Sequence, residues 1–108
     1  MDSKNLFIKS STYFRLITWQ RQNGEEWIYI GTETDFDSAR AADLVSVLEG
    51  DEIYFVTDRH ESKRVVKEDL IGSLRERIAV GNFILWDLSF DAVVEFNRIG
   101  VARQGLRF

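Results

Sequence analysis

The chain has no cysteine and no proline, and it contains a single histidine, His60. Without cysteine there is no disulfide, no thiolate nucleophile and no cysteine-bound zinc site. One histidine excludes a metal site built from several imidazoles, which leaves carboxylate sites for magnesium or calcium as the open type. We predict no metal and no cofactor, because capping and solubility account for the carboxylates and no calcium-loop spacing is present.

Long apolar runs are also missing. The longest, Phe83 to Trp86, is far shorter than the roughly 20 residues that a transmembrane helix needs. The N-terminal residues lack the basic and apolar regions of a signal peptide. We therefore expect a soluble, cytoplasmic protein, with export by a leaderless route as the alternative.

What the chain does have is a good supply of core-forming residues. Hydrophobic residues make up 44% of its 108 positions and include 8 Phe, 3 Trp and 3 Tyr. Each aromatic side chain buries a large area. The length matches the usual size of one domain, so we expect a single domain over residues 1–108.

The first third of the chain has the composition of strands. Leu6–Ile8, Thr12–Trp19 and Trp27–Gly31 are rich in β-branched and aromatic residues, which suit a pleated surface. Asn23-Gly24 between the last two supplies the positive φ angles of a type I′ turn. The sequence therefore predicts a β-hairpin over Thr12–Gly31.

Two later segments have the apolar spacing of helices. The first starts at a cap residue, Thr34 or Asp35, and ends at Gly50. The second covers Glu68–Val80 and contains Gly72, which costs about 1 kcal/mol relative to alanine. The apolar positions are 41, 44, 45 and 48 in the first helix and 70, 71, 74 and 78 in the second.

The remaining segments predict further strands and one ambiguous element. Ile53–Thr57 and Phe83–Asp87 read as strands, and positions 65–66 as a short one. Ser89 can cap a third helix that stops near Gly100, although positions 94 and 96 also fit an alternating strand. The tail from position 101 adds an edge strand or stays loose.

These elements predict an α+β fold in the order β-β-β-α-β-α-β-α. The opening hairpin favours a mainly antiparallel sheet of about five strands, with two or three helices packed on one side. A mixed sheet with a right-handed strand–helix–strand crossover is the alternative.

Charge is distributed unevenly along the chain. The net charge is −4, but the segment from Glu25 to Glu52 holds nine carboxylates and one arginine, Arg40, which gives −8 there and about +4 elsewhere. Such asymmetry points to a charged partner. An acidic surface attracts a basic protein and speeds its capture. The basic residues concentrate at Arg59, Lys63, Arg64 and Lys67, and again at Arg98, Arg103 and Arg107.

We predict a partner-binding surface that combines these carboxylates with aromatic residues of the neighbouring hairpin. Aromatic anchors surrounded by polar groups are typical of protein interfaces. The alternatives are helix capping and solubility for the carboxylates, and core packing for the rings. The predicted surface consists of Asp35, Asp37, Asp43, Glu49, Asp51, Glu52, Trp27 and Tyr29.

In size, acidity and lack of cysteine, the chain is similar to the small immunity or antitoxin proteins with which bacteria neutralise basic toxins. The likeness assigns no residue. It implies a non-enzymatic protein-binding domain that occludes a basic toxin or nuclease. Nucleic acid itself is disfavoured as a partner, because phosphate contacts need clustered lysine and arginine. The basic tail with Phe108 is the one segment that suits RNA, and solubility of an edge strand explains it more simply.

Two other classes of function stay open. Asp58, His60 and Glu61 follow a strand, and a histidine beside carboxylates there suits a general base in a small enzyme or ligand-binding domain. That hypothesis predicts a concave pocket with His60 hydrogen-bonded to a carboxylate, against the alternative of a solvated turn. The third class is a structural or regulatory subunit that self-associates through the hairpin edge. Catalysis is disfavoured, since the sequence has no phosphate loop, serine elbow or metalloprotease helix.

Overall fold

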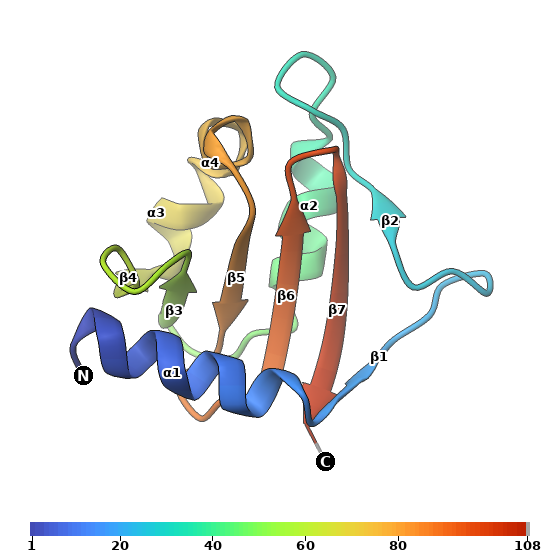
Figure 1. Ribbon diagram of the computed structural model, residues 1–108. Helices are drawn as coiled ribbons and strands as arrows, with labels where there is room; N and C mark the ends of the chain where they lie inside the picture. Colours follow the sequence, from blue (N-terminus) through green and yellow to red (C-terminus); the bar gives the residue numbers. More distant parts are fainter. Residues whose placement is uncertain (108) are drawn as a thin grey trace.

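The computed structural model describes residues 1–107, which form an α+β fold with one seven-stranded antiparallel sheet and four helices (Figure 1). The order of the strands in the sheet is β1-β7-β6-β5-β3-β4, and β2 also pairs with β7. In chain order the elements are α1 (Ser3–Phe14), β1 (Ile17–Trp19), β2 (Ile28–Tyr29), α2 (Ser38–Val45), β3 (Glu52–Val56), β4 (Lys63–Val66), α3 (Lys67–Ile71), α4 (Leu74–Val80), β5 (Phe83–Trp86), β6 (Ala92–Asn97) and β7 (Val101–Arg107).

The N-terminal segment is a helix, so the strand predicted at Leu6–Ile8 is wrong and the fold does not open with a hairpin. Of the strand predicted at Thr12–Trp19, only Ile17–Trp19 forms, as β1. Asp2 caps α1 by accepting a hydrogen bond from the backbone N–H of Asn5 at 2.8 Å. The residues that face the sheet recur at positions 6, 10, 13 and 14, which is one face of a helix. In this segment the helical spacing of the residues that face the sheet outweighs the strand-forming composition.

The predicted hairpin forms its turn but not its strand pair. Asn23 and Gly24 have φ angles of 53° and 82°, and Gln22 and Glu25 exchange two backbone hydrogen bonds of 2.8 and 3.0 Å across them. The flanking strands β1 and β2 do not pair with each other. Both pair with β7, which has seven residues and can hold one short strand near each end.

Both predicted helices exist with different limits. In the first, the cap is Asp37 instead of Thr34 or Asp35, and its carboxylate accepts the Arg40 backbone N–H at 3.0 Å. The second is divided into α3 and α4, and Gly72 is the C-cap residue of α3. Gly72 itself keeps a helical backbone, and the chain departs from helical geometry at Ser73, with φ −117° and ψ 10°.

The C-terminal part is more strand-rich than predicted. The ambiguous segment after Ser89 is strand β6, not a helix, and its alternation puts positions 92, 94 and 96 on one face. The buried carboxylate of Asp87 closes the preceding turn by accepting the backbone N–H groups of Asp91 and Ala92 at 2.9 and 3.3 Å. Strand β7 lies inside the sheet, with β6 on one side and the two short strands β1 and β2 on the other, so the predicted edge strand is an interior one.

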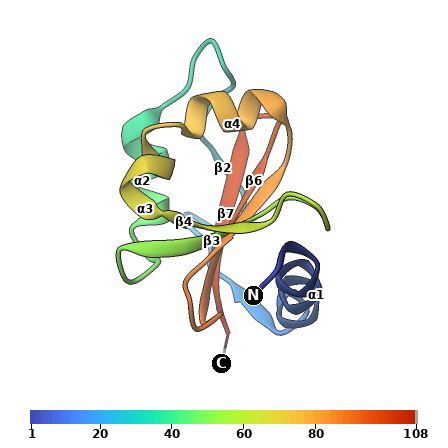
Figure 2. The same cartoon turned by 90° about the vertical axis from the view of Figure 1, so that its left-hand side faces the viewer.

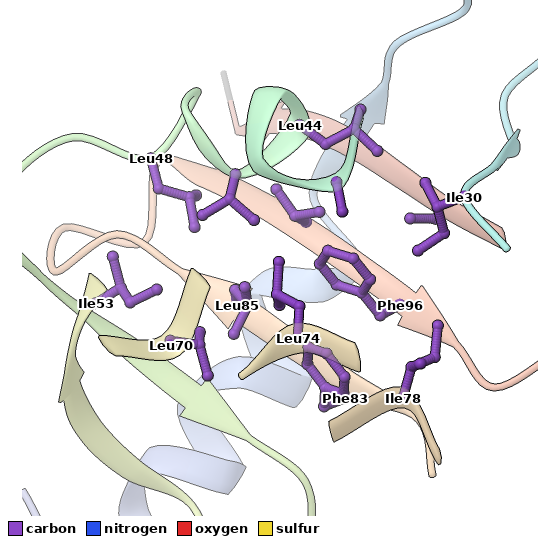
Figure 3. Close-up of a cluster of buried hydrophobic side chains, with 14 of the residues drawn as sticks. Ile30, Leu44, Leu48, Ile53, Leu70, Leu74, Ile78, Phe83, Leu85 and Phe96 are labelled. Carbon is purple, nitrogen blue, oxygen red and sulfur yellow. The ribbon is translucent and has the colours of Figure 1, made fainter. Parts of the chain in front are cut away.

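Helices cover both faces of the sheet, which corrects the prediction that they pack on one side (Figure 2). One face packs against α2, α3 and α4 in the larger core, which includes Leu44, Leu74 and Phe96 (Figure 3). The other face packs against α1 through a second cluster that contains Leu6 and Trp86. The two clusters are separate because neighbouring residues of a strand point to opposite faces.

A buried hydrogen bond fixes α1 to the sheet. The indole N–H of Trp86 on β5 donates to the hydroxyl oxygen of Ser10 on α1 at 2.8 Å, and both residues are buried. The next residue along the helix, Ser11, is exposed, and its hydroxyl donates to the backbone carbonyl of Phe7. The Ser10 hydroxyl therefore joins α1 to the sheet, whereas the Ser11 hydroxyl bonds only within α1.

We predict that Ser10→Ala lowers the free energy of unfolding by about 1–3 kcal/mol, because it leaves the buried indole N–H of Trp86 without an acceptor. The matched change Ser11→Ala should alter it by less than about 0.5 kcal/mol, as expected for an exposed site. Urea unfolding followed by circular dichroism measures both. Equal losses in the two variants would show that the Trp86–Ser10 bond does not anchor α1.

Candidate binding surfaces

Tyr29 is an exposed aromatic residue of the predicted surface, with 55% of its area accessible. It lies on the α1 side of the sheet, because Ile28 before it packs into the opposite core. Its hydroxyl donates to the carboxylate of Asp35, which also accepts the backbone N–H of Thr32 at 2.8 Å. These bonds join the loop after β2 to the strand itself.

The Tyr29–Asp35 bond changes the ionisation of both groups. Donation to the carboxylate raises the pKa of Tyr29 above its ordinary value, because the bond favours the neutral phenol. The same bond, followed by those from Thr32, holds the pKa of Asp35 below its ordinary value. Asp35 is therefore a charged residue of this surface at neutral pH.

Trp27 is engaged inside the molecule. The guanidinium carbon of Arg103 lies 4.5 Å from the centre of the Trp27 ring and 3.6 Å from that of Trp19. Arg103 also pairs with Glu26, and with Glu95 at 2.6 Å. This cluster ties the β1–β2 segment to β6 and β7. Trp27 is half-buried and belongs to neither hydrophobic cluster, so its contact is with Arg103 and not with the core.

The basic tail has partners of its own within the protein. Besides the pairs of Arg103, Arg107 contacts Asp91 at 3.1 Å and donates to the carbonyl oxygen of Phe90. These contacts favour the structural explanation over contact with RNA for Arg103 and Arg107, but not for Arg98, whose side chain has no such contact within the described residues. Phe108 lies outside the described residues.

The carboxylates of the acidic segment follow α2 along the outside of the fold. Asp37 caps the start of α2, Asp43 is exposed on it, and Glu49 and Asp51 are exposed in the loop that leads to β3. We call these four residues the α2 ridge. None of them forms an ion pair within residues 1–107. Their charges are thus available to a partner.

The structure does not gather the whole predicted surface into one patch. Asp37 and Glu49 lie beyond opposite ends of α2, a helix of eight residues that spans about 12 Å. Glu52 pairs with Arg64 on the neighbouring strand, with 2.6 Å between Arg64 Nε and the carboxylate. The acidic surface is therefore an elongated strip. Glu52 and Trp27 are not part of it, because Glu52 pairs with Arg64 and Trp27 contacts Arg103.

The turn after β3 holds the second predicted site. The carboxylate of Asp58 accepts the backbone N–H groups of His60 and Glu61 at 2.8 and 2.9 Å. These two bonds lower the pKa of Asp58. The His60 ring is exposed and makes no hydrogen bond within the described residues. Asp58 shapes the turn and leaves His60 without the carboxylate partner that a general base was predicted to have.

The concave pocket that this hypothesis predicts is nonetheless present beside the turn. Two adjoining hollows of about 260 and 410 Å³ share Phe55, Glu61 and Arg77 as lining residues. The first hollow also contacts Thr57 and Asp58, and the second contacts His60 and Lys63. Sequence reasoning placed Asp58, His60 and Glu61 here but missed Arg77 and Thr57.

Arg77 comes to this place through the spacing of α4. It follows the buried Leu74 by three residues and precedes the buried Ile78, so it borders the buried face of the helix. Its guanidinium carbon lies 4.8 Å from the centre of the Phe55 ring. The apolar spacing of the second predicted helix is the sequence signal from which Arg77 could have been placed at the edge of the core.

Comparison of the chain with protein families, with curated proteins and with solved structures finds no match. Within residues 1–107, no helix has the length and apolarity to cross a membrane. In the same residues, no three His, Asp or Glu side chains gather in a way that would hold a metal ion. The function is therefore argued from the surfaces themselves.

We predict that the two arginines that pair with glutamates, Arg64 and Arg103, differ in their contribution to stability. Arg103→Met should lower the free energy of unfolding by about 2 kcal/mol or more, because it leaves two largely covered carboxylates unpaired. Arg64→Met should cost less than about 1 kcal/mol, since its pair with Glu52 is solvated. The side chains are 16% exposed for Arg103 and 54% for Arg64. Urea unfolding compares them, and a larger loss for Arg64→Met would refute this ranking.

Proposed function

We propose that the protein is a non-enzymatic binding domain whose α2 ridge captures a basic protein, in the manner of an immunity or antitoxin-type inhibitor. The observation that carries the proposal is the set of exposed carboxylates at Asp37, Asp43, Glu49 and Asp51, which have no ion pair within residues 1–107. The ridge carries four exposed carboxylates against one exposed arginine on α2, Arg40, and such an excess of one sign on an exposed strip steers an oppositely charged protein.

Tyr29 and Asp35 extend the ridge at its N-terminal end. The backbone N–H of Asp37 donates to the carbonyl oxygen of Ile30 at 2.8 Å, so the loop that carries Asp35 returns to the end of β2. The exposed phenol of Tyr29 is bonded to Asp35, which precedes the first ridge residue, Asp37, by two positions. An exposed aromatic ring next to charged groups suits a contact that supplies affinity, while the carboxylates supply the rate of encounter.

The proposed mechanism is steric occlusion. A basic toxin or nuclease binds an anionic substrate with lysine and arginine side chains, and the α2 ridge offers carboxylates to the same groups. Bound in this way, the domain covers the substrate site without carrying out any chemistry. The lack of an oriented general base at His60 is consistent with a binding role.

We predict that the double reversal Asp43→Lys with Glu49→Lys lowers the association rate with a basic partner at least about tenfold at low salt, because charge steering depends on the sign of the ridge. The matched control is Glu25→Lys with Glu76→Lys, which changes the net charge equally at two exposed sites away from the ridge. Affinity capture from the source organism identifies the partner, and stopped-flow or surface-plasmon measurements compare the variants.

The proposal also requires that the captured protein lose its activity at a one-to-one ratio. Capture of no basic protein, or equal association rates for the ridge variant and the control, would remove the case for the ridge. Self-association, the remaining alternative, predicts a sedimentation coefficient that rises with concentration. A single monomeric species over the same range would exclude it.

A further inference from the structure

A second charged feature lies beside α4, away from the carboxylates of the ridge. The two adjoining hollows at the end of β3 share Arg77 and Phe55, and we call them together the Arg77 basin. Cations reach the basin from separate elements, Arg77 from α4 and Lys63 from β4. We propose that the Arg77 basin binds a small phosphate-bearing anion.

Arg77 is held in place without being neutralised. Its guanidinium group lies over the Phe55 ring at 4.8 Å, and it forms no ion pair within the described residues. Arg64 and Arg103 contrast with it, because each pairs with a glutamate. An aromatic face restricts the guanidinium plane but leaves its N–H donors unused, which prepares the fork for two oxygens of a phosphate.

Lys63 is positioned by strand pairing. In the antiparallel register it lies opposite Phe55, and directly opposed residues point to the same face of a sheet. Lys63 and Arg77 therefore both border the 410 Å³ hollow, together with His60. Glu61 is the carboxylate that lines this hollow, so its two permanent cations exceed it by one charge, whereas Asp58 and Glu61 exceed Arg77 by one charge in the first hollow.

The size and rim of the basin select a small ligand. The 410 Å³ of the second hollow falls at the lower end of the range, roughly 300–1,000 Å³, that is common for small-molecule pockets, and the 260 Å³ of the first lies just below it. Because Asp58 and Glu61 border the first hollow, we place the phosphate group in the second hollow, beside Arg77 and Lys63. A phosphate ester with a compact apolar part, placed against Phe55, fits both the cations and the ring.

The experiment titrates the full-length protein with pyrophosphate at constant ionic strength and follows the side-chain Nε–Hε signals of arginine by NMR. The proposal expects a saturable shift of the Arg77 signal, and sodium acetate at the same ionic strength should not reproduce it. Arg77→Gln should weaken binding at least tenfold. The matched change Arg75→Gln, at an exposed position of α4 that does not line the basin, should weaken it less than twofold.

Lys63→Gln is the second variant, because it leaves the Arg77–Phe55 contact intact and should also weaken binding several-fold. Absence of saturation, or equal effects of Arg75→Gln and Arg77→Gln, would overturn the proposal. An oligonucleotide that binds more tightly than pyrophosphate and is equally sensitive to Arg77→Gln would overturn it in favour of nucleic acid. The α2 ridge plays no part in this test, so either proposal can fail alone.

Discussion

The fold depends on one constraint, which is that the central strands are apolar on both faces. Leu85 and Trp86 on β5, and Val93 and Val94 on β6, all have 0% of their area exposed. Successive residues of a strand point to opposite faces, so each pair demands a cover above and below the sheet. Helices α2, α3 and α4 cover one face, and α1 covers the other. The N-terminal segment is thus a required layer of the core.

The sequence predicts the elements whose local signals agree with their surroundings. The strand at Ile53–Thr57, the apolar stripe of α2 and the turn at Asn23-Gly24 all have spacing or turn chemistry that no distant contact opposes. Prediction failed where tertiary contacts decide. Strand-forming residues of α1 recur at helical spacing to cover Trp86, and β1 pairs with β7 because a longer strand is available there.

For the charged surfaces too, the sequence predicts local features and misses those that depend on contacts in the folded protein. The sequence shows the excess of carboxylates between Glu25 and Glu52, because charge can be counted. It does not show that Arg64 and Arg103 neutralise Glu52 and Glu26, since these partners meet only across the folded sheet. Internal pairing therefore separates structural charges from available ones. The carboxylates along α2 and Arg77 on α4 are among the charged groups that have no ion pair within residues 1–107.

Native-state hydrogen exchange tests most directly whether α1 is a required layer of the core. The account predicts that the Trp86 indole N–H and the amides of α1 near Ser10 exchange as slowly as the amides of β5 and β6, because opening α1 would expose Trp86 and its neighbours to water. Fast exchange throughout α1, with β5 and β6 still protected, would contradict it. That result would mean that the sheet is stable with one of its faces uncovered.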